Sequence, residues 1–194
     1  PDIRKVADAT DHIFGNPNAD LFVVEYSDLE CPFCKRYNDE VMNRLENEYK
    51  DNDRVAFVYR HFPLDAPFTR ELHPSATEQS VAMECVADLV GTEAFYTFKK
   101  ALFADTTTGQ LVGDELLAKM SEYATAIGAE KVAFENCYAA QDLTRIEADF
   151  NDGRNGGVEG TPTIFVQLGD GTSYRAQPSY APLKNAIEVF LNNN

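Results

Sequence analysis

Two cysteines separated by two residues form the segment Cys31-Pro32-Phe33-Cys34, whose residue types and spacing suggest chemistry more directly than any other part of the chain. Such a pair can close a small redox-active disulfide or supply half of a tetrahedral zinc site. A structural zinc site needs four close ligands, whereas the other cysteines, Cys85 and Cys137, stand alone and the three histidines form no close pair. The spacing therefore favours redox chemistry over a zinc-stabilised scaffold, and we expect no metal site.

The sequence on either side of this pair predicts where its sulfurs lie. An apolar run predicts a buried strand over residues 21–27, and apolar residues at every third or fourth position predict a helix over about residues 32–50. Pro32 fits the first turn of that helix, because backbone N–H groups there form no hydrogen bond within the helix and its missing N–H costs nothing. Because the helix N-terminus stabilises a thiolate, we expect Cys31 to be the exposed nucleophile with a lowered pKa and Cys34 to be the resolving cysteine.

Length and composition are those of an ordinary globular protein with an acidic surface. The chain has 194 residues, of which 44% are hydrophobic and 25% charged, and its net charge is −15. This charge argues against nucleic acid and anionic membranes as partners, and no apolar run is long enough to span a membrane. The chain opens without a starting methionine or a signal-peptide core, so we expect any signal or anchor segment to lie outside this sequence.

The remaining pattern predicts an α/β fold interrupted by helices. A second buried strand over residues 55–59 completes a β-α-β unit, apolar stripes at helical spacing fill residues 70–150, and residues 1–20 are polar. Strand character then returns around the turn Gly169-Asp170-Gly171, and a helix follows. These last elements are predicted at residues 163–168, 172–176 and 182–191. The order is β-α-β, a helical block, then β-β-α, which indicates a small sheet with an inserted helical subdomain.

Three segments, in this order, give the chain its resemblance to a known family. They are Val24-Glu25-Tyr26-Ser27-Asp28 leading into Cys31-Pro32-Phe33-Cys34, then Tyr59-Arg60-His61-Phe62-Pro63-Leu64, and Gly157-Val158-Glu159-Gly160-Thr161-Pro162-Thr163. With them the chain resembles the DsbA-like branch of the thioredoxin superfamily over nearly all of residues 11–193. The resemblance implies a thioredoxin fold divided into a thioredoxin-like domain (11–64 and 151–194), an inserted α-helical domain (65–150) and an N-terminal extension (1–10).

The resemblance implies a thiol:disulfide oxidoreductase located outside the cytoplasm, in the periplasm or at the cell-envelope exterior. We expect an oxidase that donates the Cys31–Cys34 disulfide to reduced secreted proteins through a mixed disulfide and is reoxidised by a membrane quinone-linked partner. The implied protein is a monomer and needs no cofactor besides its own disulfide. A reductase or isomerase of the same fold is an alternative, as is a non-catalytic peptide-binding or chaperone module.

The resemblance also implies a substrate-binding loop beside the cysteines. The peptide bond between Thr161 and Pro162 is cis in similar proteins, and the backbone before it pairs with an extended substrate peptide. We therefore expect Phe33, Gly160, Thr161 and Pro162 to bind substrate. Pro32, Phe33, Thr161 and Pro162 are expected to be part of the catalytic site. From the residues alone, an ordinary trans proline at the start of a strand is the alternative.

Glu25 is the proton relay that the resemblance implies. It matches the position of a buried acid that similar proteins use to exchange a proton with the inner cysteine, here Cys34. A strand residue that faces solvent is the alternative. Glu30, next to Cys31, is expected to be a surface charge whose negative sign would raise the pKa of that thiol.

The remaining predictions concern one departure from the family, two cysteines and two histidines. The best-known strong oxidants of this family carry a histidine where this chain has Phe33, so the resemblance leaves the oxidising strength of the pair open.

The resemblance also implies a structural disulfide between Cys85 and Cys137 in the helical domain; two reduced buried cysteines are the alternative. His61 and His73 are expected to be packed or capping residues rather than catalytic ones.

Overall fold

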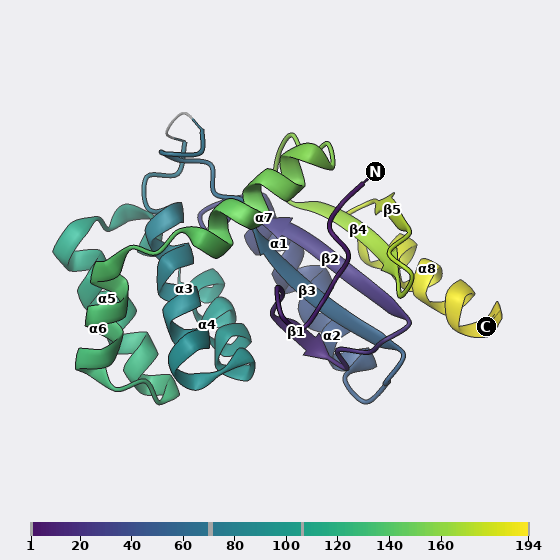
Figure 1. The fold of residues 1–194 in the computed structure, drawn as a ribbon, viewed down its shortest axis with the longest axis horizontal. Helices are drawn as coiled ribbons and strands as arrows, with labels where there is room; N and C mark the ends of the chain where they lie inside the picture. The colour runs from purple at the N-terminus through teal and green to yellow at the C-terminus, as the bar shows by residue number, and fades with distance from the viewer. Residues whose placement is uncertain (1, 70–71, 106, 194) are drawn as a thin grey trace.

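The computed structural model describes residues 2–69, 72–105 and 107–193. Residues 1 and 194, the outer ends of the predicted N-terminal extension and thioredoxin-like domain, lie outside the described residues, as do residues 70, 71 and 106 of the predicted insertion. The described part of the chain consists of a sheet with helices on both faces and a second group of helices beside it (Figure 1).

Within the described residues the sheet has five strands, in the order β1-β3-β2-β4-β5. Their bounds are Ile13–Gly15 (β1), Leu21–Ser27 (β2), Val55–His61 (β3), Thr163–Leu168 (β4) and Ser173–Ala176 (β5). β2 and β3 run parallel, and the other neighbouring strands are antiparallel. Every residue of β2 is buried, as expected for a strand covered on both faces, and its sequence is therefore a nearly continuous apolar run.

The edge strand β1 is a feature that the polar composition of residues 1–20 does not predict. It pairs with β3 over only three residues, with Ile13 opposite Val58. A strand this short, between polar stretches, carries no alternating pattern. Gly15 ends it with a φ of 106°, a left-handed conformation that favours glycine.

β3 continues two residues beyond the predicted strand, through Arg60 and His61. Both side chains are buried although they are polar. The Arg60 guanidinium has no exposed surface and donates to Asp11 at 2.8 Å and to Asp152 at 2.9 Å. These two carboxylates compensate its charge, which allows an arginine to lie inside the sheet.

The helix predicted after the cysteine pair is one helical run with a wider turn inside it. α1 covers Pro32–Tyr37, α2 covers Asn43–Tyr49, and a π-helical segment, Asn38–Met42, joins them. π turns inside α-helices occur frequently at functional sites. This one directs the side chain of Asn38 toward the sheet, where it bonds Glu25.

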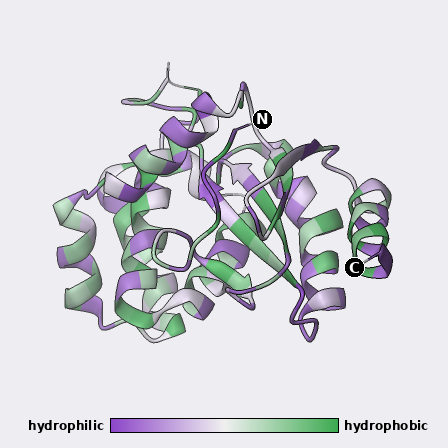
Figure 2. Cartoon of the chain, turned by 45° about the vertical axis from the view of Figure 1, so that its right-hand side comes forward, coloured by the Kyte–Doolittle hydropathy of each residue, from purple (hydrophilic) through white to green (hydrophobic). Residues whose placement is uncertain are grey.

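Different elements of the chain pack on the two faces of the sheet. On one face, α1, α2 and the C-terminal helix α8, Tyr180–Asn193, pack against alternate residues of β2, β3 and β4. On the other face, the N-terminal segment and α7, Thr144–Asn155, cover the intervening residues through Ile3, Val6 and Phe150. Figure 2 shows the consequence, with hydrophobic (green) strands at the centre of the molecule.

The helices between β3 and β4 form a second packed group. α3 (Ala76–Val90), α4 (Thr92–Ala104), α5 (Gly113–Ile127) and α6 (Lys131–Ala140) enclose an apolar core on the opposite side of the molecule from α8 (Figure 1). Cys31 and Cys34 belong to the same apolar cluster, so the cysteine pair lies where the two packed groups meet. α7 crosses the predicted domain boundary at residue 150, which therefore falls within a helix. No helix of the described ranges is both long and apolar enough to cross a membrane.

Candidate active site

The cysteine pair lies at the turn that connects β2 to α1. Cys31 is the residue before the helix, with φ −68° and ψ 118°, and Pro32 is the first helical residue. Cys34 follows in the first turn and is completely buried. Both cysteines are free thiols, so the structure presents a dithiol at the start of a helix.

Cys31 is less accessible than expected. Only 4% of the residue is exposed, so the prediction of an exposed nucleophile is wrong. Its thiol donates a hydrogen bond to the carbonyl oxygen of Thr161, with 3.5 Å between the two atoms, and the loop that carries Thr161 therefore covers the sulfur. The neighbouring Phe33 is 61% exposed and marks the surface beside the thiol.

The two thiols have opposite pKa shifts. A hydrogen bond from the Cys34 thiol is the largest of the effects that lower the pKa of Cys31 to about 6. The Thr161 side chain and the backbone N–H groups at the start of α1 act in the same direction, and burial opposes them. Burial raises the pKa of Cys34 well above its ordinary value, and its neighbour Cys31 raises it further. At neutral pH the dithiol therefore holds a thiolate on Cys31 and a proton on Cys34.

A loop before β4 completes the surface beside the cysteines. The Thr161–Pro162 peptide bond is cis, and both residues line a groove of about 240 Å³. The other residues that line this groove are Phe33, Arg36, Tyr37, Glu40, Val41 and Pro178. Gly160 is not one of them; its carbonyl oxygen accepts a hydrogen bond from the Thr163 hydroxyl at 2.7 Å. Three of the four residues predicted to bind substrate thus share one groove.

Glu25 is fully buried within β2, so the solvent-facing alternative is wrong. The side-chain amide of Asn38 donates to Glu25 Oε1 at 3.0 Å and to the carbonyl oxygen of Cys34 at 3.3 Å. One side chain therefore links the acid to the inner cysteine. Burial raises the pKa of Glu25 to about 7, although the charge of Lys99 opposes the shift.

Several polar atoms near this acid lack a partner. Among the described residues, Oε2 of Glu25 and the hydroxyl groups of Ser27 and Tyr59 are buried without a hydrogen bond. Burial, followed by the charges of Glu25 and Cys34, raises the pKa of Tyr59 well above its ordinary value. Glu25, Ser27 and Tyr59 are all buried, so they form one polar cluster close to Cys34.

Lys99 of α4 brings a positive charge into the same region. Its ammonium group has no exposed surface and lies 3.2 Å from Glu46 of α2. The ammonium nitrogen also lies over the rings of Tyr59 and Tyr96. Because Lys99 belongs to the helical group and Glu46 to a helix on the sheet, this ion pair joins the two packed groups. The two residues are 53 positions apart, so no local sequence pattern indicates the pair.

Glu30 is not the surface charge that the sequence predicts. Its Oε1 accepts hydrogen bonds from the backbone N–H of Ser75 at 3.0 Å and from the side chain of Gln79 at 3.1 Å. The residue is half-buried against the start of α3. Burial, and then the nearby charge of Asp28, raises the pKa of Glu30 to about 7.

The histidines lie in two polar clusters. Nε2 of His61 is 2.9 Å from Oε1 of Glu84, and Nε2 of His12 is 3.0 Å from Oε2 of the same residue. His61 is therefore buried and bonds a side chain of α3. His73 instead bonds Asp28, with Nδ1 2.9 Å from Oδ2, and so contacts the loop that carries Cys31. Nowhere in the described ranges do three or more His, Cys, Asp or Glu side chains form a group that could hold a metal ion.

Cys85 and Cys137 form a disulfide that joins α3 to α6. Their Cα atoms are 5.8 Å apart, and 52 positions separate them in the sequence. The alternative of two reduced cysteines therefore does not hold in this structure. The bridge lies within the helical group, where it links two helices that pack against each other.

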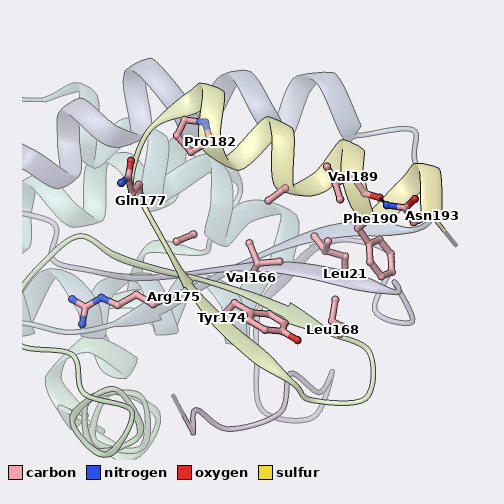
Figure 3. A pocket seen from close by; sticks show the side chains of 12 residues that line it. Leu21, Val166, Leu168, Tyr174, Arg175, Gln177, Pro182, Val189, Phe190 and Asn193 are labelled. Atoms are coloured by element: carbon pink, nitrogen blue, oxygen red, sulfur yellow. Dashed lines mark hydrogen bonds between the residues drawn. The ribbon is translucent and has the colours of Figure 1, made fainter.

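An apolar pocket of about 510 Å³ lies between the sheet and α8, away from the cysteines (Figure 3). Side chains from β4, β5 and α8 gather around it, among them Val166, Tyr174 and Phe190. It includes Leu21, the first residue of β2, whereas the cysteines follow the last residue of that strand. The thiol chemistry therefore belongs to the smaller groove beside Pro162.

Comparisons with known proteins agree with this architecture. The sequence profile Thioredoxin_4, described as Thioredoxin, matches residues 7–189. The crystal structure of DsbA2 from Pseudomonas aeruginosa is 27% identical, covers 93% of this chain and 94% of its own, and superposes with a TM-score of 0.69. A Bacillus cereus protein named "Probable disulfide bond formation protein D" is 23% identical over 94% of this chain and 80% of its own length.

A relative of higher identity has a different name and a longer chain. The Na(+)/H(+) antiporter NhaA 1 of Mycobacterium sp. (strain KMS) is 32% identical over 96% of this chain, but the match covers 28% of that protein. This chain spans little more than a quarter of the length of that protein. The profile match covers most of the chain, and the chain belongs to the Thioredoxin family, with the DsbA-like thiol–disulfide oxidoreductase fold.

Proposed function

We propose that this protein is a disulfide oxidase that transfers the Cys31–Cys34 disulfide to reduced secreted proteins. The observation that carries the proposal is the contrast between the thiols, with the pKa of Cys31 lowered to about 6 and that of Cys34 raised. A thiolate on Cys31 stabilises the dithiol form and so favours donation of the disulfide. We place the protein outside the cytoplasm, in the periplasm or at the cell-envelope exterior. The Cys85–Cys137 bridge supports this location, because disulfides persist in oxidising compartments.

The proposed reaction consists of two thiol–disulfide exchanges. A substrate thiolate attacks Sγ of Cys31, the Cys31–Cys34 bond breaks, and Cys34 leaves with the electron pair and takes up a proton. A second substrate thiolate then attacks the substrate sulfur of the mixed disulfide and releases Cys31 as a thiolate. The substrate loses two electrons and this protein gains them. The two sulfurs carry the electrons without a further cofactor.

The groove beside the cysteines is the proposed binding site for the substrate peptide. Thr161, Pro162 and the exposed Phe33 all line it, and Phe33 offers an apolar contact to the peptide. Main-chain hydrogen bonds to an extended peptide suit an enzyme that accepts many sequences. We propose that the protein acts as a monomer and that a membrane quinone-linked partner restores its disulfide, as the family resemblance implies.

The direction of transfer is tested by mixing the oxidised protein with an equimolar reduced peptide that carries two cysteines. We expect the peptide to become oxidised and the protein to become reduced, as measured by alkylation of free thiols and mass spectrometry. The Cys85→Ala/Cys137→Ala variant restricts the thiol count to one pair. Reduction of an oxidised peptide by the dithiol protein would instead identify a reductase, and an absence of exchange would favour a peptide-binding module.

We further propose that Glu25 exchanges a proton with Cys34 when that cysteine enters or leaves the disulfide. A pKa raised to about 7 allows Glu25 to act as acid or base near neutral pH. Glu25→Gln is expected to slow the attack of Cys34 on a preformed mixed disulfide by about a hundredfold. The variant should also lose the rise in rate with pH through about 7. Rapid mixing, with release of the substrate thiol as the readout, measures both effects.

The stability of the fold provides an independent check on Glu25. Its pKa is raised from 4.5 to about 7 in the folded protein, so the folded state keeps a proton that the unfolded state has lost. Stability therefore falls as the pH rises across this range, by on the order of 3 kcal/mol from this residue. Glu25→Gln should lack this part of the decline, and the exposed Glu40→Gln should keep it. Identical pH profiles for wild type and Glu25→Gln would contradict the assignment.

A further inference from the structure

Asp28 joins three separate segments of the chain next to the cysteine motif. Its Oδ1 accepts hydrogen bonds from the backbone N–H groups of Glu30 at 2.7 Å and Cys31 at 3.2 Å. Its Oδ2 accepts from the backbone N–H of Leu64 at 2.7 Å and from Nδ1 of His73 at 2.9 Å. Asp28 is almost completely buried, so a buried carboxylate fixes His73 beside the start of the motif.

The charges of this loop oppose the ionisation of Cys31. Asp28 and Glu30 are both acids, and a negative charge near a thiol raises the pKa of that thiol. Within the motif, Phe33 is neutral and supplies no compensating charge. A cation close to these acids would therefore stabilise the Cys31 thiolate.

His73 can provide this cation. Its imidazole is 20% exposed and bonds the Asp28 carboxylate. The hydrogen bond to Asp28, joined by the charges of Asp28, Cys31 and Glu30, raises the pKa of His73 although burial lowers it. The Cys31 thiolate thus favours the imidazolium form of His73. By reciprocity, the imidazolium favours the thiolate by the same free energy.

The other charged groups around the motif are Lys35 and Arg36 on α1, Asp39 in the π-helical segment, Asp65 in the loop after β3, and Glu78 on α3. Lys35 bonds the Phe103 carbonyl and lies 3.4 Å from Asp39, and Arg36 lies over the Phe33 ring. Asp65 bonds Thr77. Glu30 titrates near 7 and, once ionised, adds to the negative charge that His73 offsets.

We propose that His73 is a positioning residue that sets a positive charge against Asp28 and thereby keeps Cys31 ionised. The reactivity of the motif then depends on the protonation of a histidine that lies outside it, in the segment leading into α3. This inference deepens the proposed function and rests on it. The extra stabilisation of the thiolate is largest where both groups are charged, and it is lost when Cys31 is protonated at low pH or His73 is deprotonated at higher pH.

The ultraviolet absorbance of the thiolate, followed against pH in the reduced protein, tests this inference. His73→Gln keeps a hydrogen-bond donor without a charge and is expected to raise the pKa of Cys31 by about one unit. This tenfold loss of thiolate stability corresponds to a reduction potential lower by about 30 mV. His73→Lys, which retains a positive charge, should keep the low pKa. His12→Gln is the matched control, because His12 bonds Glu84 instead of Asp28, and its titration should match that of the wild type.

A titration of folded His73→Gln that coincides with the wild-type curve would overturn the inference. If this variant does not fold, the imidazole of His73 can be titrated by nuclear magnetic resonance in the wild type and in Cys31→Ser. The pKa of His73 is expected to be lower in Cys31→Ser, where the thiolate is absent, and equal values would overturn the inference. Both readouts concern the reduced protein alone, so this inference can fail while disulfide donation succeeds, and the reverse.

Discussion

Replacing the nucleophile, Cys31→Ser, is expected to abolish disulfide donation to a peptide dithiol. Sulfur 31 forms the bond to substrate in the mixed disulfide, and a serine hydroxyl cannot form that bond. The rate should fall by about a thousandfold or more, to that of uncatalysed exchange. Serine is close to cysteine in size, so the packing around this residue, which is 4% exposed, should be retained.

Trapping distinguishes the roles of the two cysteines and serves as the control for this loss. Cys34→Ala keeps the nucleophile but lacks the resolving thiol. When its Cys31 thiolate attacks a peptide whose single cysteine is activated as a disulfide with thionitrobenzoate, thionitrobenzoate leaves as a thiolate, and the mixed disulfide between Cys31 and the peptide should accumulate. Mass spectrometry of the intact protein detects the adduct. Cys34 is completely buried, so Cys31→Ser should form no such adduct. An adduct on Cys34 at a comparable rate would reverse the proposed roles.

Removing the second disulfide, with Cys85→Ala/Cys137→Ala, is expected to lower the free energy of unfolding by about 4 kcal/mol. The bridge spans 52 sequence positions between α3 and α6, and a cross-link over a loop of this length strongly restricts the unfolded chain. Guanidinium unfolding of the wild type and the double variant measures the difference. A loss below about 1 kcal/mol would contradict a structural role.

Redox activity provides the matched control for the double variant. The bridge connects two helices of the helical group, whereas Cys31 precedes α1 on the sheet. The double variant should therefore donate its remaining disulfide to the peptide at a rate close to that of the wild type. A loss of donation together with normal stability would show that the second disulfide takes part in the redox reaction.

The order of elements follows from local patterns, which is why the sequence predicts most of the fold. The strand Leu21–Ser27, the helical run that starts at Pro32 and the strand Thr163–Leu168 lie where their apolar spacing places them. A buried strand and an amphipathic helix each show their burial directly in the spacing of apolar residues. Gly169-Asp170-Gly171 likewise marks the turn between β4 and β5.

The features that sequence does not predict depend on distant partners. β1 is stabilised by pairing with β3, and its three residues carry no pattern of their own. Arg60 extends β3 because Asp11 and Asp152 neutralise it from other elements. The low exposure of Cys31 likewise comes from the Thr161 loop, 130 positions away.

Some residues of the candidate site can likewise be recognised from the sequence, and others cannot. Cys31 and Cys34 are recognisable from spacing, and Glu25 from the family resemblance. The groups proposed to adjust their pKa values cannot be recognised from spacing or resemblance. Asn38 reaches Glu25 from a π turn, and His73 reaches Asp28 across 45 positions. Such polar contacts depend on how elements pack, and no periodicity of the sequence predicts them.

The reduction potential of the Cys31–Cys34 pair decides whether this protein donates disulfides or reduces them. It is measured by equilibrating the protein in glutathione buffers of known ratio, with Cys85→Ala/Cys137→Ala as the control that leaves one redox pair. We expect a value of about −120 mV, typical of a strong disulfide donor, in spite of Phe33. A value of about −270 mV, typical of a reductant, would contradict the proposal that this protein donates disulfides.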